Sequence, residues 1–242
     1  MKHEPEDVAS LIGFLDHPDK AVVRPAVDSL ITLGTRRPEI KESLDRLLHD
    51  PRRKKLWPIA YTLAQLSAPS SRCLDVLIEG LGSEDQDIRW ATFLLLTRVG
   101  KKDKRIAPLL LDLLKTGTAN QRRVAVYCLR DMGMGDETVL ERVIQTLRDP
   151  DPLVRVAAVT SLKIRAEVGK DGLDLLLHLF SEDPDSRVRC SAAITLAQLG
   201  APTERIRTAL RDASTSMDPR LKKAASAAMK LLKKKEPRPP TK

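Results

Sequence analysis

The sequence has few of the residues on which enzymes and membrane proteins depend. Only 3% of its 242 residues are aromatic, and it holds 4 histidines, 3 cysteines and 11 glycines. No apolar run is long enough to cross a membrane, and the start MKHEPEDVAS does not show the charged start followed by an apolar stretch that is typical of a secretory leader. We therefore expect a cytoplasmic protein that makes no contact with a membrane.

The residues needed for catalysis and metal binding are not arranged in any motif. The four histidines are scattered (His3, His17, His49 and His178), and there is no H-E-x-x-H, Gly-rich phosphate loop or G-x-S-x-G sequence. The three cysteines stand far apart without C-x-x-C spacing, which is typical of reduced thiols (Cys73, Cys128 and Cys190). The sequence predicts no enzyme, no catalytic residue, no metal and no cofactor.

What the sequence does contain is a repeat of about 33 residues. Aligning the chain on the glycine that ends DPDSRVRCSAAITLAQLG gives seven equivalent positions, Gly34, Ser67, Gly100, Gly133, Ala166, Gly200 and Lys233. Four residues before each lies a large apolar residue (Leu30, Leu63, Leu96, Leu129, Leu162, Leu196 and Met229). Ten residues after an anchor another apolar column begins (Leu11, Leu44, Leu77, Leu110, Val143, Leu176 and Leu210). Each unit therefore reads as two amphipathic helices.

A single short helix pair cannot bury such apolar stripes, so the copies must cover one another. The pattern predicts an all-α, right-handed α-solenoid of seven helical hairpins with a 33-residue period. We expect one continuous array over residues 1–235, with units ending near 34, 67, 100, 133, 166, 200 and 233. Residues 236–242, EPRPPTK, have no apolar side chain other than proline and are predicted to form a disordered Pro/Lys-rich tail.

One motif recurs where the second helix of a unit begins. D-x-x-V-R followed by an Ala-rich helix and L-x-x-L-G occurs at Asp151–Arg155 and Asp185–Arg189, with a close variant at Asp85–Arg89. This motif resembles HEAT repeats, which form armadillo-like solenoids, and particularly the short repeats of phycobilin lyases. The resemblance implies a protein-binding scaffold, or a role in attaching a cofactor or chromophore to another protein. It also implies that the motif arginines and aspartates form a structural ladder between repeats.

The resemblance is weakest in the first two units. The motif arginine is replaced there by Val23 and Leu56, and prolines stand at Pro25 and Pro58. Proline inside a helix removes a backbone hydrogen bond and clashes with the preceding turn. We expect these two second helices to start late or to kink.

The net charge of +9 is concentrated at one end of the chain. From Arg220 onward there are nine basic residues and one acidic residue, which leaves the preceding array nearly neutral. This end is either a solubilising cap or a contact for an acidic partner or nucleic acid. The candidate residues for an electrostatic contact are Lys222, Lys223, Lys230, Lys233, Lys234 and Lys235.

The aromatic residues share one predicted surface. At 100° per residue, the positions one and five after the motif arginine point away from the core, toward the concave surface. Every Trp and Tyr of the chain lies in these two columns, within units two to four. These rings are either a binding surface or inner packing between neighbouring helices. The predicted partner-binding residues, including cationic flanks, are Trp57, Tyr61, Trp90, Leu94, Arg98, Arg123, Tyr127 and Arg130.

The sequence thus favours a non-enzymatic scaffold that binds a protein or peptide, preferably acidic, in an aromatic-lined groove. The alternative is a nucleic-acid-binding repeat protein that uses its basic end and stacks bases on the groove aromatics. A DNA glycosylase is a remote version of that alternative, because it shares only the helical-repeat architecture.

Overall fold

The computed structural model describes residues 7–133, 137–162, 168–199 and 203–235, apart from the side chain of Lys235. All regular structure in these residues is helical, with no strand. The predicted tail, 236–242, lies outside the described residues. The helices are α1 (Val8–Phe14), α2 (Lys20–Gly34), α3 (Pro38–Leu48), α4 (Trp57–Leu66), α5 (Ser71–Gly80), α6 (Gln86–Gly100), α7 (Ile106–Thr116), α8 (Ala119–Met132), α9 (Glu137–Gln145), the 3₁₀ helix η1 (Thr146–Arg148), α10 (Pro152–Leu162), α11 (Gly169–Glu182), α12 (Ser186–Leu199), α13 (Glu204–Ala213) and α14 (Pro219–Lys235).

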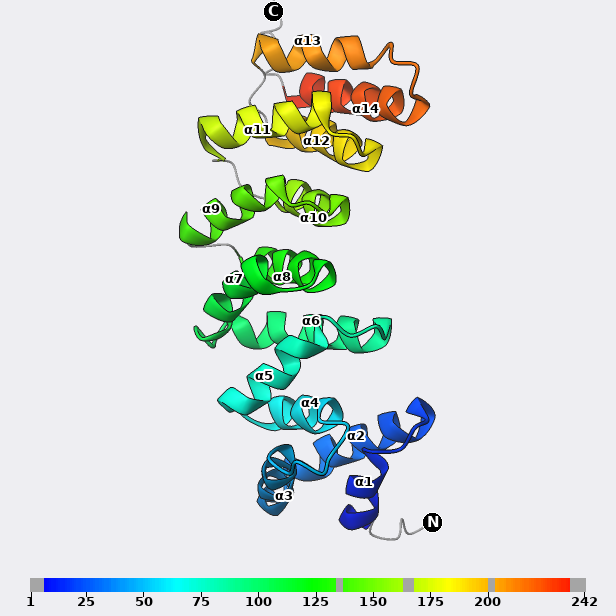
Figure 1. Ribbon diagram of the computed structural model, residues 1–242, viewed down its shortest axis with the longest axis vertical. Helices are drawn as coiled ribbons and strands as arrows, with labels where there is room; N and C mark the ends of the chain where they lie inside the picture. Colours follow the sequence, from blue (N-terminus) through cyan, green and yellow to red (C-terminus); the bar gives the residue numbers. More distant parts are fainter. Residues whose placement is uncertain (1–6, 134–136, 163–167, 200–202, 236–242) are drawn as a thin grey trace, which may run out of the picture. The chain divides into compact units, whose positions relative to one another are not determined.

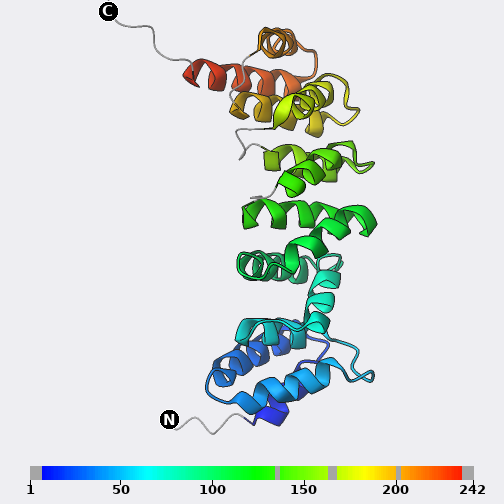
Figure 2. The same ribbon diagram turned by 90° about the vertical axis from the view of Figure 1, so that its left-hand side faces the viewer.

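The chain divides into two compact units, Met1–Leu110 and Leu111–Lys242, called here the N-terminal and C-terminal units. In the N-terminal unit α2 packs against α4, and α4 against α6. In the C-terminal unit α8, α10, α12 and α14 pack in succession, and the first helices α9, α11 and α13 lie beside α10, α12 and α14 (Figures 1 and 2). Each unit therefore has the layered helix pairs of an α-solenoid, as the sequence predicts.

The repeated apolar columns form the core. The leucines that precede each anchor are buried in every described unit up to α12, including Leu30, Leu96 and Leu196. The first-helix column is buried as well (Leu11, Leu44, Leu77, Leu110, Val143, Leu176 and Leu210). The prediction of which residues lie inside is confirmed, because a helix that shows apolar side chains every three or four residues has one face to bury.

The two early prolines act differently. Helix α2 begins at Lys20 and continues through Pro25, whereas α4 begins only at Trp57, with Pro58 in its first turn. Proline is accepted in a first turn because its missing N–H would have no helical partner there. Of the two changes expected at these prolines, a late start or a kink, α4 shows the late start.

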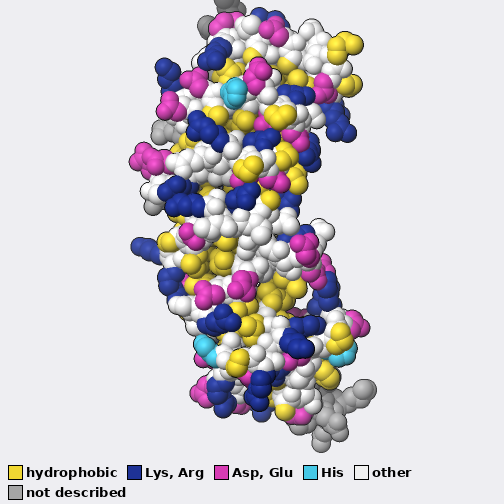
Figure 3. Space-filling view, viewed as in Figure 1, with side chains coloured by type: hydrophobic (Ala, Val, Ile, Leu, Met, Phe, Trp, Pro, Cys, Tyr) yellow, Lys and Arg dark blue, Asp and Glu magenta, His cyan; other side chains and the backbone are white. Residues whose placement is uncertain are grey.

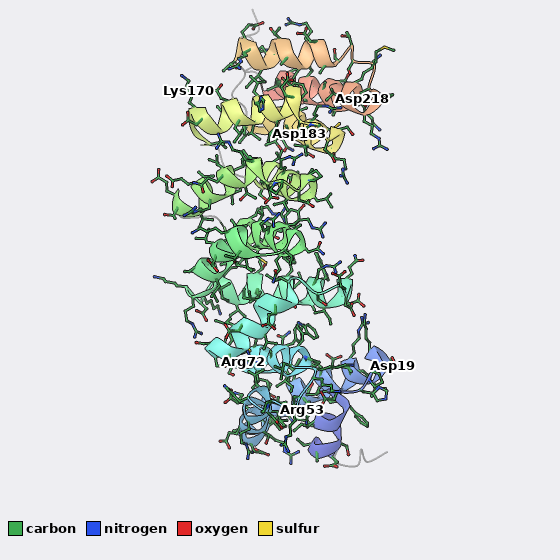
Figure 4. The ribbon with its side chains drawn as sticks, viewed as in Figure 1. Asp19, Arg53, Arg72, Lys170, Asp183 and Asp218 are labelled. Carbon is green, nitrogen blue, oxygen red and sulfur yellow. The ribbon has the colours of Figure 1, made fainter. Side chains whose placement is uncertain are left out.

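Charged side chains connect the starts of α2 and α6, the helices on either side of α4. Arg24 Nη2 lies 2.6 Å from Asp87 Oδ2, and Lys20 pairs with both Asp85 and Asp87. The residues before α4 instead contact the turn after α1, where Arg53 pairs with Asp16. Figure 4 labels Asp19 and Arg53 in this part of the N-terminal unit. The shortened α4 is thus accompanied by ion pairs that join the first and third helix pairs.

The motif arginines form the predicted ladder in the C-terminal unit. Arg122 donates from Nε and Nη2 to Asp149 at 2.7 and 2.8 Å, and Arg155 donates in the same way to Asp183 at 2.7 and 2.9 Å. Arg189 continues the series with Asp218 at 3.2 Å. Each guanidinium therefore ties one helix pair to the next by charge-assisted hydrogen bonds.

The motif aspartates cap helices, but they are not the carboxylates that accept the ladder arginines. Asp151 and Asp185 instead accept backbone N–H groups from the first turns of α10 and α12. In D-P-D, the second aspartate is close enough to cap the following helix, so the first is left to accept the arginine of the preceding repeat. Asp183 and Asp218 are labelled in Figure 4 where α12 and α14 begin.

Within the described residues no helix is both long and apolar enough to cross a bilayer.

Candidate partner-binding surfaces

Trp57 and Tyr61 of α4 are held in the packing of the N-terminal unit. Both side chains are half-buried, and their ring centroids lie 4.9 Å apart. Trp57 Nε1 donates a 2.7 Å hydrogen bond to Oγ1 of the buried Thr92 on α6. A Cβ on Gly80 would lie only 2.9 Å from the Trp57 ring, so the backbone of α5 passes directly beside the indole. Trp57 of α4 thus packs against both α5 and α6, and we call this contact the Trp57 wedge.

Trp90 and Leu94 of α6 are in a different environment. Trp90 is 61% exposed and Leu94, one turn later, is 49% exposed. The Trp90 ring stacks on Phe93 with centroids 5.2 Å apart, and Phe93 is buried. Trp90 is therefore an exposed ring attached to a rigid base, and with Leu94 it forms what we call the α6 surface.

Cationic side chains lie on the same helix columns as the α6 surface. Arg24 is paired with Asp87, and Arg98 is exposed and donates a hydrogen bond to Gln65 of α4. Both guanidinium groups already have partners. The Asp87 carboxylate offsets the charge of Arg24, whereas the neutral amide of Gln65 leaves the charge of Arg98 in place.

The remaining predicted residues belong to α8 in the C-terminal unit. Tyr127 is half-buried, and the Arg130 guanidinium carbon lies 4.9 Å from its ring centroid. Arg130 also pairs with Asp131 at 2.5 Å, and Arg123 donates to Asn120 at 3.1 Å. These side chains form a local cation–π cluster on α8.

The predicted basic contact lies along α14. Lys222, Lys223, Lys230, Lys233 and Lys234 are all exposed, while the side chain of Lys235 lies outside the described residues. On the face shown in Figure 3, dark-blue side chains gather along the edge of the C-terminal unit where Figure 4 labels Asp218. The start of α14 is thus a positively charged region.

Three exposed apolar residues were not predicted from the sequence. These are Phe14, Leu153 and Met217. Phe14 and Met217 lie at or near turns, outside the two columns used to find the aromatic surface. A periodicity argument ranks positions on helix faces, so it has no means of detecting residues at helix ends.

The described residues offer little for catalysis. No group of three or more His, Cys, Asp or Glu side chains among them is placed to hold a metal ion. Burial raises the pKa of Cys73 to about 12, so this thiol is protonated at neutral pH. Burial also raises the pKa of Cys190, which makes it a weak nucleophile.

The comparison with protein families agrees with the repeat motif. The sequence model of HEAT repeats matches residues 107–197 and 140–230, which together make up just over half of the chain. The chain belongs to the HEAT-repeat family. The matched region contains the whole arginine ladder, and the shortened α4 lies outside it. No curated protein matches the chain in sequence.

Solved structures with similar folds include other repeat proteins. The karyopherin Kap121p bound to the extreme C-terminus of the protein phosphatase Cdc14p has a TM-score of 0.66 at 16% identity, over 93% of this chain and 29% of the karyopherin. An archaeal HEAT-like repeats protein from Thermococcus onnurineus NA1 has a TM-score of 0.54 at 13% identity, over 96% and 98% of the two chains. The complex of CpcE and CpcF of phycocyanin lyase from Nostoc sp. PCC7120 has a TM-score of 0.41 at 19% identity, over 97% and 96%. The TM-scores of the karyopherin and of the archaeal protein show likeness of fold alone.

Proposed function

We propose that this HEAT-repeat protein is a non-enzymatic scaffold that binds a segment of another protein on the α6 surface. The observation that carries the proposal is the 61% exposure of Trp90 on a buried Phe93 base. A large exposed ring held in one orientation loses little conformational freedom on binding, which is why Trp is enriched among the residues that dominate binding energy. The karyopherin of similar fold, which holds the C-terminal end of a phosphatase, supports the proposal by analogy.

Among the predicted aromatic and apolar contact residues of the N-terminal unit, not all are available to a partner. Trp57 already donates its indole N–H to Thr92, and its ring is packed beside Gly80. A partner could gain little from it without displacing that packing. Trp90 and Leu94 are exposed, so they are the proposed contact residues, while Trp57 contacts α6 through its hydrogen bond to Thr92.

The test compares the pair Trp90 and Leu94 with a single exposed apolar residue of the same unit, Phe14. The chain and its Trp90→Ala/Leu94→Ala variant are used to capture partners from the source cell, and Phe14→Ala is the matched control. The bound partner is identified by mass spectrometry, and its binding segment is synthesised for titration. Loss of a central Trp anchor should weaken binding by about 2 kcal/mol, roughly thirtyfold. Phe14→Ala should change the affinity less than twofold.

A spectroscopic measurement separates contact from indirect effects. With Trp57 replaced by Phe, Trp90 is the single tryptophan, and its emission should shift to the blue when the segment covers it. Equal affinity of the wild type and the Trp90→Ala/Leu94→Ala variant, or no shift at saturation, would contradict the proposal.

A further inference from the structure

The C-terminal unit contains a recess where the starts of α12 and α14 lie side by side. Its volume is about 410 Å³, within the usual range of about 300–1,000 Å³ for binding pockets. The floor is made of small side chains, Cys190 from α12 and Ala224 and Ala227 from α14. Arg187, Arg220 and Lys223 complete the lining.

Two of the lining residues, Cys190 and Ala227, are small side chains at repeat positions that carry large side chains in α4 and α6. Cys190 and Lys223 occupy the same repeat position as Trp57 and Trp90, and Ala227 occupies the position of Tyr61 and Leu94. In the N-terminal unit those side chains fill the space between second helices or project from it. Here their replacements leave a hollow with an apolar floor.

The charges around the recess do not cancel. Arg187 is paired with Asp185 at 2.6 Å, and Asp218 is occupied by Arg189 at 3.2 Å and by the N–H groups of Arg220 and Leu221. Among the described residues, Arg220 and Lys223 have no ion-pair partner. Two cations without an ion-pair partner therefore stand three residues apart on one side of α14.

We propose that this recess binds an acidic peptide segment of a partner protein, with Asp or Glu carboxylates on Arg220 and Lys223 and a small apolar residue on the floor. Charge complementarity selects the carboxylates, and the shallow floor of Cys190, Ala224 and Ala227 selects a small side chain between them. This site lies wholly in the C-terminal unit. It is therefore independent of the proposed function of the α6 surface, and either one can fail alone.

Cys190 provides a built-in reporter of occupancy. The other two cysteines of the chain, Cys73 and Cys128, are buried, whereas Cys190 is half-buried and faces the recess. Maleimide labelling of the folded protein therefore reports on Cys190. A segment seated on the floor should block the thiol and slow its labelling at least fivefold at saturation.

The experiment uses the full chain and a capped eight-residue peptide in which Glu alternates with Ala and Val. Binding is followed by fluorescence anisotropy and by the labelling rate of Cys190. Arg220→Ala/Lys223→Ala should weaken binding about tenfold, as expected for two partly exposed charge pairs. The control Lys222→Ala/Lys230→Ala removes the same charge from exposed positions of α14 outside the recess, and should have less than a twofold effect.

Two further arms distinguish other occupants. The same peptide with Gln in place of Glu should neither bind nor protect Cys190. An equal loss of affinity in both double variants would overturn the proposal, because it would show nonspecific attraction to α14. Protection of Cys190 by a single-stranded oligonucleotide but not by the acidic peptide would also overturn it.

Discussion

The two units use the same helix positions in opposite ways. In α4 and α6 of the N-terminal unit, the positions one and five residues after that of the motif arginine carry aromatic and apolar side chains, one of them an indole that projects into solvent. In the last helix pairs of the C-terminal unit they carry Cys190, Lys223 and Ala227, which leave a basic recess. A repeat architecture fixes the core columns but leaves the inner columns free to vary, so surfaces of different chemistry can be built on one backbone pattern.

The units also differ in how neighbouring helix pairs are connected. The C-terminal unit uses bidentate Arg–Asp pairs with little solvent exposure, whereas the N-terminal unit uses the Trp57 wedge and exposed ion pairs at Lys20 and Arg24. Arg89 carries the motif in the N-terminal unit, but its guanidinium donates to the Ser83 carbonyl, and the ladder position of the next repeat is Thr116. The following predictions test this difference, beginning with the largest effect.

Breaking the ladder should cost the most stability. In Arg155→Ala the carboxylate of Asp183, whose side chain is only 2% exposed, loses both its hydrogen bonds to the guanidinium. An uncompensated buried charge typically lowers the free energy of unfolding by about 3–5 kcal/mol. Urea denaturation followed by circular dichroism measures this loss.

The matched control for the ladder is Arg89→Ala. It removes a hydrogen bond to a backbone carbonyl and should cost about 1 kcal/mol. Similar losses of unfolding free energy in Arg155→Ala and Arg89→Ala would show that the bidentate pairs do not distinguish the stability of the two units.

The next largest effect is expected at the two tryptophans, whose replacement should lower the free energy of unfolding by different amounts. Trp57→Ala removes a packed ring and leaves Thr92 without its hydrogen-bond donor, which should lower the free energy of unfolding by about 2–3 kcal/mol. Trp90→Ala removes a mostly exposed ring and should cost under about 1 kcal/mol. Denaturation curves of both variants provide the comparison, and a reversed order would refute the assignment of wedge and anchor.

Acid should weaken the cap of α12 at low pH. The Arg187 guanidinium, with the Arg187 backbone N–H, lowers the pKa of Asp185 from 3.8 to about 2. A carboxylate with a lowered folded-state pKa contributes stability above about pH 4, and this contribution is lost as the pH falls toward 2. In Arg187→Ala, NMR titration of the Asp185 carboxyl carbon should show a pKa closer to 3.8. An unchanged midpoint would mean that the side-chain pair is not formed in solution.

The smallest effect is expected at the exposed ion pairs of the N-terminal unit. Asp87→Asn removes the carboxylate that pairs with Lys20 and Arg24, all three side chains being more than half exposed. Salt screens such pairs, so the variant should differ measurably from wild type only at low ionic strength. Thermal melts at low and high salt test this. A large fall in melting temperature at high salt would contradict the prediction, because it would show that these pairs stabilise the fold as the ladder pairs do.

The sequence alone determined the helical repeat, the buried columns and the repeat position of the ladder arginines, although Arg89 at that position finds no carboxylate among the described residues. These follow from local periodicity, because side chains three or four residues apart share a helix face whatever surrounds the helix. Tertiary structure decided which carboxylate each arginine reaches, that Trp57 is packed while Trp90 is exposed, and that small residues on α12 and α14 leave a recess. Those outcomes depend on where one helix begins relative to its neighbour. At α4 the helix begins late, with Pro58 in its first turn, and Trp57, a predicted contact residue, is part of the packing.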